Sequence, residues 1–473
     1  MESHYDVLII GGGPGGTPTA MALASAGKQV LLVESGEGLG GTCLFEGCIP
    51  SKIMRESARR LRELREAADF GLCLPTQDVR LDWSAIQERK RAILQRRSQG
   101  AMQHLQQFPS LNFLHGNAQL LGPRQAQINF TDGKSVNVDF EHAIIATGSL
   151  PFLPPIKGID HPRVLDNQSI LAIDHVPNDL TIIGAGPIGV ELAQIFRTFG
   201  SKVTVLEAAP GILGPVDQEL AGLLRQRMEA DGIEVHTDCH VDAIVHSGQD
   251  VYVEYTPSGQ DKQHKFTENV LVAVGRRPNI AGLGIENTNI EHTAHGLVVD
   301  ATLQTTEPGI YAVGDVIGQP MFAHWATAQG LMLARHLLGQ PVAFPERHTN
   351  TAVIFSEPEL AMAGLTEAQA QEADIDVGVA LYDFKQDARA QIAGRESGML
   401  KIIFDKSNRK VVGVHVLVEG AGDLMGEAAV LIKTGLPLEA IAGAIHPHPT
   451  LAESFVLAVR NAMAPHRPNI SRQ

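Results

Sequence analysis

The stretch YDVLIIGGGPGG, residues 5–16, decides the fold. An apolar run typical of a buried strand leads directly into a glycine-rich turn, and a helical pattern follows over residues 17–26. In such a unit Gly11 permits a tight turn, Gly13 lets a pyrophosphate approach the backbone, and Gly16 lets helix and strand pack closely. The helix N-terminus supplies amide donors and positive potential for the phosphates. The stretch therefore predicts a dinucleotide-binding site.

A carboxylate completes this first unit. A second strand, expected over 29–33, ends at Glu34, about 20 residues beyond the turn, where a carboxylate can bind ribose hydroxyls. This full context is a more specific signal than the glycines alone.

The same unit occurs a second time. The strand is expected at 179–183, the turn GAGPIG at 184–189, the helix at 190–199, and a strand at 202–206 that ends at Glu207. Two such units predict two dinucleotides, one of them a flavin, because proteins of this kind pass a hydride between the two. A carboxylate at Glu207 accepts a free ribose 2′-hydroxyl and repels a 2′-phosphate, so NAD is preferred over NADP.

The composition limits the class of protein. A chain of 473 residues is expected to form about three domains, and 44% apolar residues is ordinary for a globular enzyme. The net charge of −15 argues against binding to nucleic acid or to anionic membrane surfaces, since both attract basic patches. We find no apolar run of about 18 residues and no signal peptide, and therefore expect a cytoplasmic protein.

The cysteines are too few for a disulfide scaffold. They are Cys43, Cys48, Cys73 and Cys239. A close pair such as Cys43 and Cys48 in a reducing compartment indicates catalysis or metal binding. A metal site needs a second pair or nearby histidines, and neither lies near Cys48, so no metal is predicted.

The close pair lies in GGTCLFEGCIPSK, residues 40–52. Five residues of continuous helix would place the two side chains about 140° apart, so an undistorted helix would not align them. Gly47 and Pro50 permit a local distortion, and a nearby helix N-terminus would lower a thiol pKa. Beside a flavin motif, the pair is interpreted as a redox-active disulfide rather than as two buried apolar side chains.

This segment resembles the active-site signature of the pyridine nucleotide–disulfide oxidoreductases, and the resemblance covers essentially the whole chain. Further matching motifs are Ala146-Thr147-Gly148, Gly275-Arg276-Arg277-Pro278-Asn279, Ile310-Tyr311-Ala312-Val313-Gly314-Asp315 and His448-Pro449-Thr450. The resemblance implies an α/β protein with two Rossmann-like dinucleotide-binding domains and a C-terminal α+β dimerisation domain. It also implies FAD, NAD and a homodimer.

The resemblance assigns roles to individual residues. It implies that FAD is bound by Gly11, Gly13, Gly16, Glu34, Thr42, Lys52, Thr147, Gly148, Asp315 and Ala323, and NAD by Gly184, Gly186, Gly189, Glu207 and Gly275. Asp315 would bind the ribityl chain, and Lys52 would lie beside the isoalloxazine ring and pair with Glu191. Cys43 would exchange with the substrate, whereas Cys48 would face the flavin.

Acid–base chemistry is expected near the C-terminus. Thiol–disulfide exchange needs a proton acceptor, and histidine titrates near neutral pH. The resemblance selects His448 as the base and Glu453 as its orienting carboxylate, and it implies that the base comes from the other subunit. His446 is expected only to shape the loop.

Within the family, the chain most resembles the dihydrolipoamide-oxidising branch. The predicted activity is therefore oxidation of dihydrolipoamide, or of protein-bound dihydrolipoyl groups, with NAD⁺. Glu207 argues against glutathione reductase, and the lack of cysteine after Cys239 argues against mercuric reductase and the large thioredoxin reductases. Two alternatives stay open: a soluble pyridine nucleotide transhydrogenase, and a flavoprotein subunit that docks into a complex with vestigial catalysis.

The transhydrogenase alternative rests on local similarities. They are His161-Pro162-Arg163, Ala388-Arg389-Ala390-Gln391-Ile392 and Gly314-Asp315-Val316-Ile317-Gly318. Such an enzyme has no chemical use for paired cysteines or for a His-Pro-Thr base. Departures from the dihydrolipoamide branch at Phe45, Glu46 and Trp325 concern the substrate more than the chemistry. A Glu46 carboxylate turned to the disulfide would oppose thiolate formation, and we expect it to face solvent instead.

The order of motifs predicts the domain boundaries. These are a first FAD-binding part at 1–148, an NAD-binding domain at 149–275, a return of the FAD domain at 276–345, and a dimerisation domain at 346–473. The Arg- and Glu-rich stretch at 53–67 is expected to be a solvated helix face.

Overall fold

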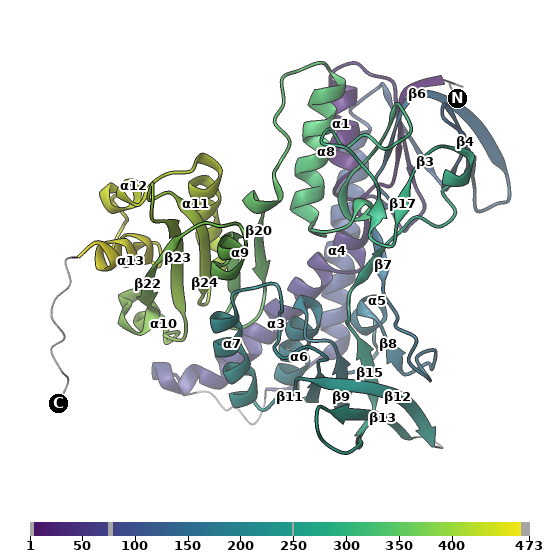
Figure 1. Ribbon diagram of the computed structural model, residues 1–473. Coiled ribbons are helices and arrows are strands. Elements are labelled where there is room, and N and C mark those ends of the chain that lie inside the picture. Colours follow the sequence, from purple (N-terminus) through teal and green to yellow (C-terminus); the bar gives the residue numbers. More distant parts are fainter. Residues whose placement is uncertain (1–3, 74–78, 248–249, 465–473) are drawn as a thin grey trace, which may run out of the picture.

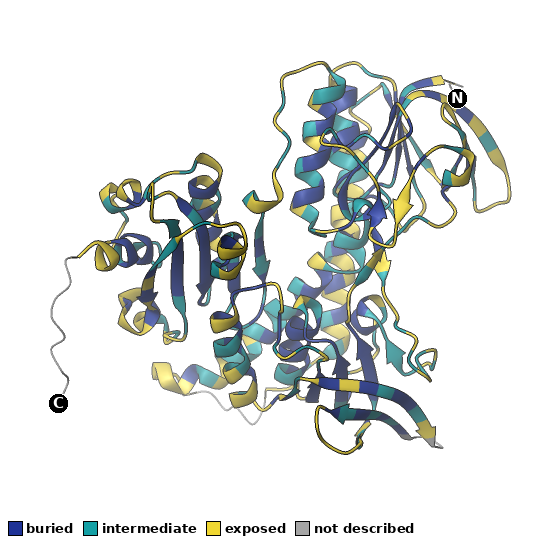
Figure 2. Ribbon diagram, in the orientation of Figure 1, coloured by how far each residue is buried: buried dark blue, intermediate teal, exposed yellow. Residues whose placement is uncertain are grey.

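Three large sheets and several smaller ones organise the chain in the computed structural model, which describes residues 4–73, 79–247 and 250–464 (Figure 1). Buried residues concentrate in the strands of these sheets and in the helix faces packed on them (Figure 2). No helix in the described part of the chain is long and apolar enough to cross a membrane.

The first sheet has seven strands in the order β3-β2-β1-β6-β5-β4, with β19 paired to β6 on a separate branch. Its strands are β1 (His4–Ile10), β2 (Val30–Glu34), β3 (Leu111–His115), β4 (Asn117–Gly122), β5 (Gln125–Asn129), β6 (Ser135–Ile145) and β19 (Ile310–Ala312). β1, β2, β3, β6 and β19 pair in parallel, and the apolar runs of β1, β2, β19 and the end of β6 are buried on both faces. Helices α1 (Thr17–Ser25) and α8 (Ala323–Leu337) pack together beside this sheet.

The second sheet has five parallel strands in the order β11-β10-β9-β15-β8. They are β8 (Val164–Leu165), β9 (Asp179–Ile183), β10 (Lys202–Leu206), β11 (Glu234–His236) and β15 (Asn269–Val272). β9 and β10 have the bounds expected from the sequence, whereas helix α6 (Pro187–Phe199) begins three residues earlier than expected, with Pro187 in its first turn. A three-stranded antiparallel sheet, β12 (Cys239–Ser247), β13 (Asp250–Pro257) and β14 (Gln263–Thr267), extends from this unit.

The chain passes between the two units as a pair of strands. β7 (Ser149–Pro151) leaves the first sheet and pairs antiparallel with β16 (Arg276–Pro278), on which the chain returns. The boundaries proposed near residues 148 and 275 therefore lie at this double crossing. β19, which rejoins the first sheet, lies within the return segment proposed at 276–345.

The third sheet lies in the C-terminal part of the chain. It is antiparallel, in the order β20-β21-β24-β23-β22. Its strands are β20 (Thr351–Ile354), β21 (Leu360–Gly364), β22 (Val377–Asp383), β23 (Met399–Asp405) and β24 (Val411–Leu417). Helices α11 (Ala421–Thr434) and α13 (Glu453–Met463) pack on the sheet and share a core with it.

A long helix, α3 (Cys48–Glu66), runs from the redox segment past α6 and α4 (Trp83–Leu105). The prediction that its charged residues form a solvated face is partly wrong. Arg55 and Arg62 are 16% and 19% exposed in their side chains, and they pair with Glu359 and Glu357 in the connection between β20 and β21. These two arginines contact acidic groups of the C-terminal domain, so they join two domains rather than face solvent.

Candidate functional site

The predicted cysteine pair lies at a break between two helices. Cys43 belongs to α2 (Gly41–Phe45), and Cys48 is the first residue of α3. The two thiols are hydrogen-bonded to each other, and the structure records both as free. One continuous helix could not align them, and the break at Glu46 and Gly47 removes that obstacle.

Gly41 explains why glycine precedes this segment. Its φ is +53°, and a Cβ there would lie 2.9 Å from the Cα of Gly13. Only glycine allows the redox segment to pack this closely on the first glycine turn.

The two thiols differ in their electrostatic surroundings. The hydrogen bond from Cys43 and the charge of Lys52 lower the pKa of Cys48 to about 7, although Cys48 loses part of its hydration to the protein atoms around it. Its position at the N-terminus of α3 favours the thiolate in the same direction. The hydrogen bond to Cys48 and burial raise the pKa of Cys43 well above its ordinary value. At neutral pH the arrangement therefore favours a Cys48 thiolate beside a Cys43 thiol.

The expected ion pair between Lys52 and Glu191 is confirmed. Lys52 Nζ on α3 lies 2.7 Å from Glu191 Oε2 on α6, and the Glu191 side chain is 10% exposed. One turn of α3 separates Lys52 from Cys48, which brings its charge near the thiol. The predicted place of Lys52 beside a flavin ring stays a prediction.

The first glycine turn has the shape that a dinucleotide requires. A Cβ at Gly11 would lie 2.3 Å from the carbonyl oxygen of Ala146, and one at Gly16 would lie 1.8 Å from that of Gly11. At Gly13 a Cβ would meet only the Cα of Gly41, at the ordinary contact distance of 3.9 Å. Glu34 accepts hydrogen bonds from the backbone N–H groups of Gly12 and Gly36, each at 2.7 Å, which places its carboxylate at the turn.

The other residues expected to bind FAD gather around this turn. α8 begins at Ala323, and the hydroxyl of its Thr327 donates to the Pro14 carbonyl oxygen at 3.0 Å. Asp315 accepts a hydrogen bond from the Ser149 hydroxyl at 2.6 Å. The remaining members are Thr42, Thr147 and Gly148. The Thr42 hydroxyl donates to Glu46 at 3.3 Å, and the Thr147 hydroxyl donates to the Asn279 carbonyl oxygen at 2.7 Å. Gly148 has a φ of +70°. These residues fit an FAD site.

A cavity of about 630 Å³ lies at the second glycine turn. Its lining includes the predicted residues Gly184, Gly186, Glu207 and Gly275. A Cβ at Gly189 would lie 2.0 Å from the Gly184 carbonyl oxygen, which repeats the close packing of the first turn.

The charge of this cavity agrees with the predicted cofactor. Glu207 accepts hydrogen bonds from the N–H groups of Ala185 at 2.6 Å and Ala209 at 2.8 Å. Among the lining residues that the structure describes, the acids are Glu207 and Asp242, and there is no lysine or arginine. Such a site fits NAD and disfavours a 2′-phosphate.

The predicted base and its carboxylate are also brought together. His448 Nδ1 lies 3.1 Å from both carboxylate oxygens of Glu453, the first residue of α13. The backbone N–H of Thr450 donates to Glu453 at 3.0 Å, and this bond, followed by His448, lowers the pKa of Glu453. The ionised carboxylate can hold a proton on Nδ1 and so leave Nε2 to accept one. His446 is held separately, with Nε2 3.1 Å from Glu427.

Glu46 departs from the sequence prediction. It was expected to face solvent, but it is half-buried and accepts the hydrogen bond from Thr42. Its backbone oxygen accepts from the Asn167 side chain at 2.7 Å. The short stretch between the cysteines is therefore packed against the second domain through its backbone.

The sequence analysis missed Arg276 as a site residue, although it quoted the motif that contains it. From β16, Arg276 donates to the Ser149 hydroxyl at 2.8 Å and to Asn167 at 3.2 Å. Burial lowers its pKa, whereas Asp315, Glu46 and Cys48 act in the opposite direction. The Arg276 cation thus lies between Asp315 and the redox segment, and no spacing in the sequence signals this.

Comparison with known proteins gives one consistent result. Residues 5–330 match the pyridine nucleotide-disulphide oxidoreductase family, and residues 351–459 match the dimerisation domain of that family. A dihydrolipoyl dehydrogenase of Bacillus subtilis (strain 168) is 34% identical over 449 residues, covering 95% of this chain and 96% of the relative. Dihydrolipoyl dehydrogenase 3 of Haloarcula marismortui is also 34% identical and covers 99% of both chains.

Solved structures extend this comparison. LpdA from Mycobacterium tuberculosis superposes with a TM-score of 0.90 at 25% identity, over 98% of this chain and 100% of that one. The HOCl-induced flavoprotein disulfide reductase RclA from Escherichia coli, in a Cu(II) complex, superposes with a TM-score of 0.87 at 28% identity, over the same shares.

Proposed function

This chain belongs to the pyridine nucleotide-disulphide oxidoreductase family, and on that premise we propose that it oxidises dihydrolipoamide, or dihydrolipoyl groups carried on a protein, with NAD⁺. The general class of activity follows from the family, whatever the substrate: the chain is an NAD-linked flavoprotein oxidoreductase that uses FAD. The dimerisation domain supports a homodimer.

The observation that carries the proposal is the hydrogen-bonded pair of Cys43 and Cys48. The two thiols can join as a disulfide, and their unequal pKa values suit them to different tasks. In exchange with a dithiol, the thiol that leaves as a stabilised thiolate departs fastest. Cys48 has that property, so we assign attack by the substrate to Cys43 and the leaving thiolate to Cys48.

The proposed reaction balances as dithiol plus NAD⁺ to cyclic disulfide plus NADH and H⁺. His448 takes the proton of one substrate thiol, and the resulting thiolate attacks the sulfur of Cys43. The Cys43–Cys48 bond breaks and Cys48 leaves as a thiolate. The second substrate thiol then displaces Cys43 and closes the product disulfide, and its proton passes to the departing Cys43 sulfur, so that the enzyme holds a Cys43 thiol, a Cys48 thiolate and a protonated His448. FAD supplies the two-electron carrier between the cysteine pair and NAD⁺.

The base is proposed to act across the dimer. His448 is exposed, in the C-terminal domain, beside Ile445, whose side chain is 97% exposed. This part of the chain matches the dimerisation domain of the family, which supports a second chain on this side of the molecule. A homodimer would bring His448 of one chain to the cysteines of the other.

The two alternative functions account for less of the site. A transhydrogenase would pass a hydride between nucleotides without a cysteine pair or a His448–Glu453 pair. A docking subunit with vestigial catalysis would have no need for the Lys52–Glu191 pair at the redox segment.

The test is a steady-state assay of the purified enzyme with dihydrolipoamide and either NAD⁺ or NADP⁺. We expect turnover that prefers NAD⁺ and that is lost in Cys43→Ser. If NADH reduces the flavin and the cysteine pair, yet dihydrolipoamide is not oxidised, the substrate is a different disulfide. If NADH produces no long-wavelength thiolate–flavin absorbance, the cysteine pair is not redox-active, and the transhydrogenase or docking alternative holds.

A further inference from the structure

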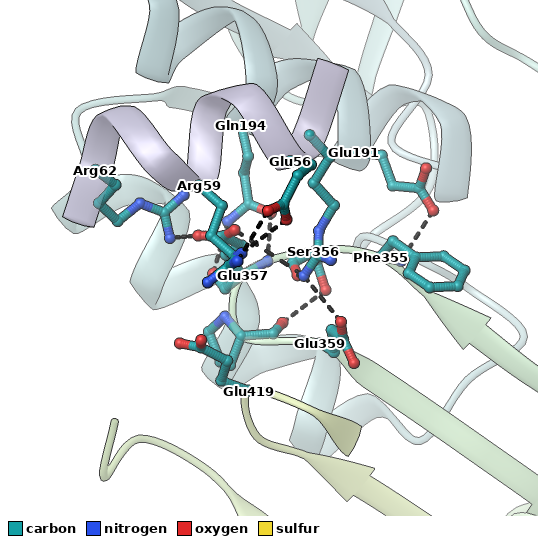
Figure 3. Close-up of polar contacts among 12 residues, drawn as sticks. Glu56, Arg59, Arg62, Glu191, Gln194, Phe355, Ser356, Glu357, Glu359 and Glu419 are labelled. Atoms are coloured by element: carbon teal, nitrogen blue, oxygen red, sulfur yellow. Dashed lines mark hydrogen bonds and ion pairs between the residues drawn. The ribbon is translucent and has the colours of Figure 1, made fainter. Parts of the chain in front are cut away.

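Residues 355–359, the connection from β20 to β21, lie between the redox helix α3 and the NAD-domain helix α6 (Figure 3). Gln194 of α6 holds the backbone of Glu357 twice, accepting from its N–H at 2.9 Å and donating to its carbonyl oxygen at 2.8 Å. Arg55 of α3 donates to the Ser356 carbonyl oxygen at 3.1 Å and pairs with Glu359 at 3.0 Å. These contacts fix the segment to both helices, so its position depends on α3 and α6 as well as on its own domain.

Phe355, the first residue of this segment, contacts both partners of the active-site ion pair. Its backbone N–H donates to Glu191 Oε1 at 2.9 Å, while Glu191 Oε2 accepts from Lys52 (Figure 3 shows the Phe355 bond). The Lys52 ammonium lies 4.4 Å from the centroid of the Phe355 ring. That distance is within the range in which an aromatic face attracts a cation. One residue of the third domain therefore contacts the acid through its backbone and the amine through its ring.

We propose that Phe355 is a positioning residue for Lys52, its ring holding the ammonium group toward Cys48 while its N–H fixes the carboxylate that pairs with it. The inference concerns the Lys52–Glu191–Cys48 group and deepens the proposed function, because it names what keeps the charge beside the leaving thiolate. It does not depend on which dithiol is the substrate.

The physical reason is the mobility of a lysine side chain. The Lys52 side chain is 29% exposed, so the ammonium group has access to water and to other rotamers. Glu191 offers one attachment, and the Phe355 ring offers a second from another direction. With both in place, the ammonium stays where it lowers the pKa of Cys48. The charged or titratable groups that act on Cys48 are Cys43, Lys52, Glu191 and Arg276.

The test compares Phe355→Leu with Phe355→Tyr in the two-electron-reduced holoenzyme. Leucine keeps an apolar side chain and the N–H bond to Glu191 but removes the aromatic face, whereas tyrosine keeps the face. Iodoacetamide alkylation of Cys48 is followed by mass spectrometry across pH, together with the pH dependence of the long-wavelength absorbance. We expect Phe355→Leu to raise the apparent pKa of Cys48 by about half a unit, a roughly threefold lower thiolate-to-thiol ratio. Phe355→Tyr should stay near the wild-type value.

A double-mutant cycle separates positioning from a general packing effect. In a Lys52→Met background the cation is gone, so Phe355→Leu should cause no further shift in the Cys48 pKa. An unchanged pKa in Phe355→Leu, or an equal shift with and without Lys52, would overturn the inference. If Phe355→Leu does not fold, graded fluorination of the Phe355 ring keeps its shape while weakening its face, and an absence of graded pKa change would overturn the inference equally.

These readouts do not use dihydrolipoamide. A failure of dihydrolipoamide turnover with an intact Phe355 effect would therefore contradict the proposed substrate alone. Normal dihydrolipoamide turnover without a Phe355 effect on the Cys48 pKa would contradict the positioning role alone.

Discussion

Replacing His448 with glutamine tests how the active site is assembled. The change removes the proposed base and leaves the flavin-side residues untouched. A free thiol is only a few per cent ionised at neutral pH, so loss of a positioned base should lower dihydrolipoamide turnover by about 10²–10⁴-fold. Reduction of the enzyme by NADH should remain, because that half of the reaction does not need His448.

The contacts of Glu453 allow the loss of turnover in a second variant, Glu453→Gln, to be predicted. Its two carboxylate oxygens lie 3.1 Å from His448 Nδ1, and the Thr450 N–H holds it in place. Glu453→Gln keeps a hydrogen-bond acceptor but loses the charge that stabilises the imidazolium. A charged hydrogen bond contributes about 1.5–3 kcal/mol, so turnover should fall by roughly 10- to 150-fold, less than in His448→Gln.

Mixed dimers show whether the base crosses the interface. When inactive His448→Gln chains and inactive Cys43→Ser chains are reassembled, each heterodimer should contain one complete site. With random assortment in a two-fold symmetric dimer, about a quarter of wild-type activity should return. Verified heterodimers without activity would refute the shared site, and full turnover in His448→Gln alone would refute the base.

Three further predictions follow from the cofactor site, the ion pair and an interdomain charge cluster. Replacing Glu207 with serine should reduce the preference for NAD over NADP in kcat/KM by roughly 1–3 kcal/mol. An unchanged ratio of the two kcat/KM values would show that this carboxylate does not set the preference. Lys52→Met should raise the pKa of the Cys48 thiol by about one unit, because the ammonium acts to lower it; an unchanged pKa in an alkylation titration would contradict this. Lys401 is 5% exposed and lies among three carboxylates from two domains. Replacing it with methionine should lower the free energy of unfolding by about 2–3 kcal/mol, and an unchanged midpoint of urea denaturation would contradict that value.

The strands and turns that form the two nucleotide units could be predicted from local sequence. β9 and β10 have the predicted bounds, and apart from one buried threonine in each, the residues after the first are apolar and buried, as expected for strands covered on both faces. Gly16 is required by a close contact with Gly11 in the same short unit, whereas the close contact at Gly11 is with the distant Ala146. Local chemistry is sufficient here because each unit is made from consecutive residues.

The parts that could not be predicted depend on residues far apart in the chain. Arg55 contacts Ser356, and the charge pattern of a helix does not show which of its arginines meet an acidic segment some three hundred positions later. The same holds for Arg276 and Glu46, which are brought near each other by the crossing of two domains. Family motifs indicated the proposed catalytic residues, but the groups that contact those residues come from tertiary packing.

The most direct test of the central claim is a differential alkylation of the holoenzyme before and after anaerobic addition of NADH. The account predicts that Cys43 and Cys48 become alkylated only after reduction, together with a long-wavelength absorbance. The labelling of exposed Cys73 and of buried Cys239, whose pKa burial raises to about 11, should be the same in both states. Flavin reduction without new thiols at Cys43 and Cys48, or with new labelling at Cys73 or Cys239 instead, would contradict the claim that this pair carries the electrons.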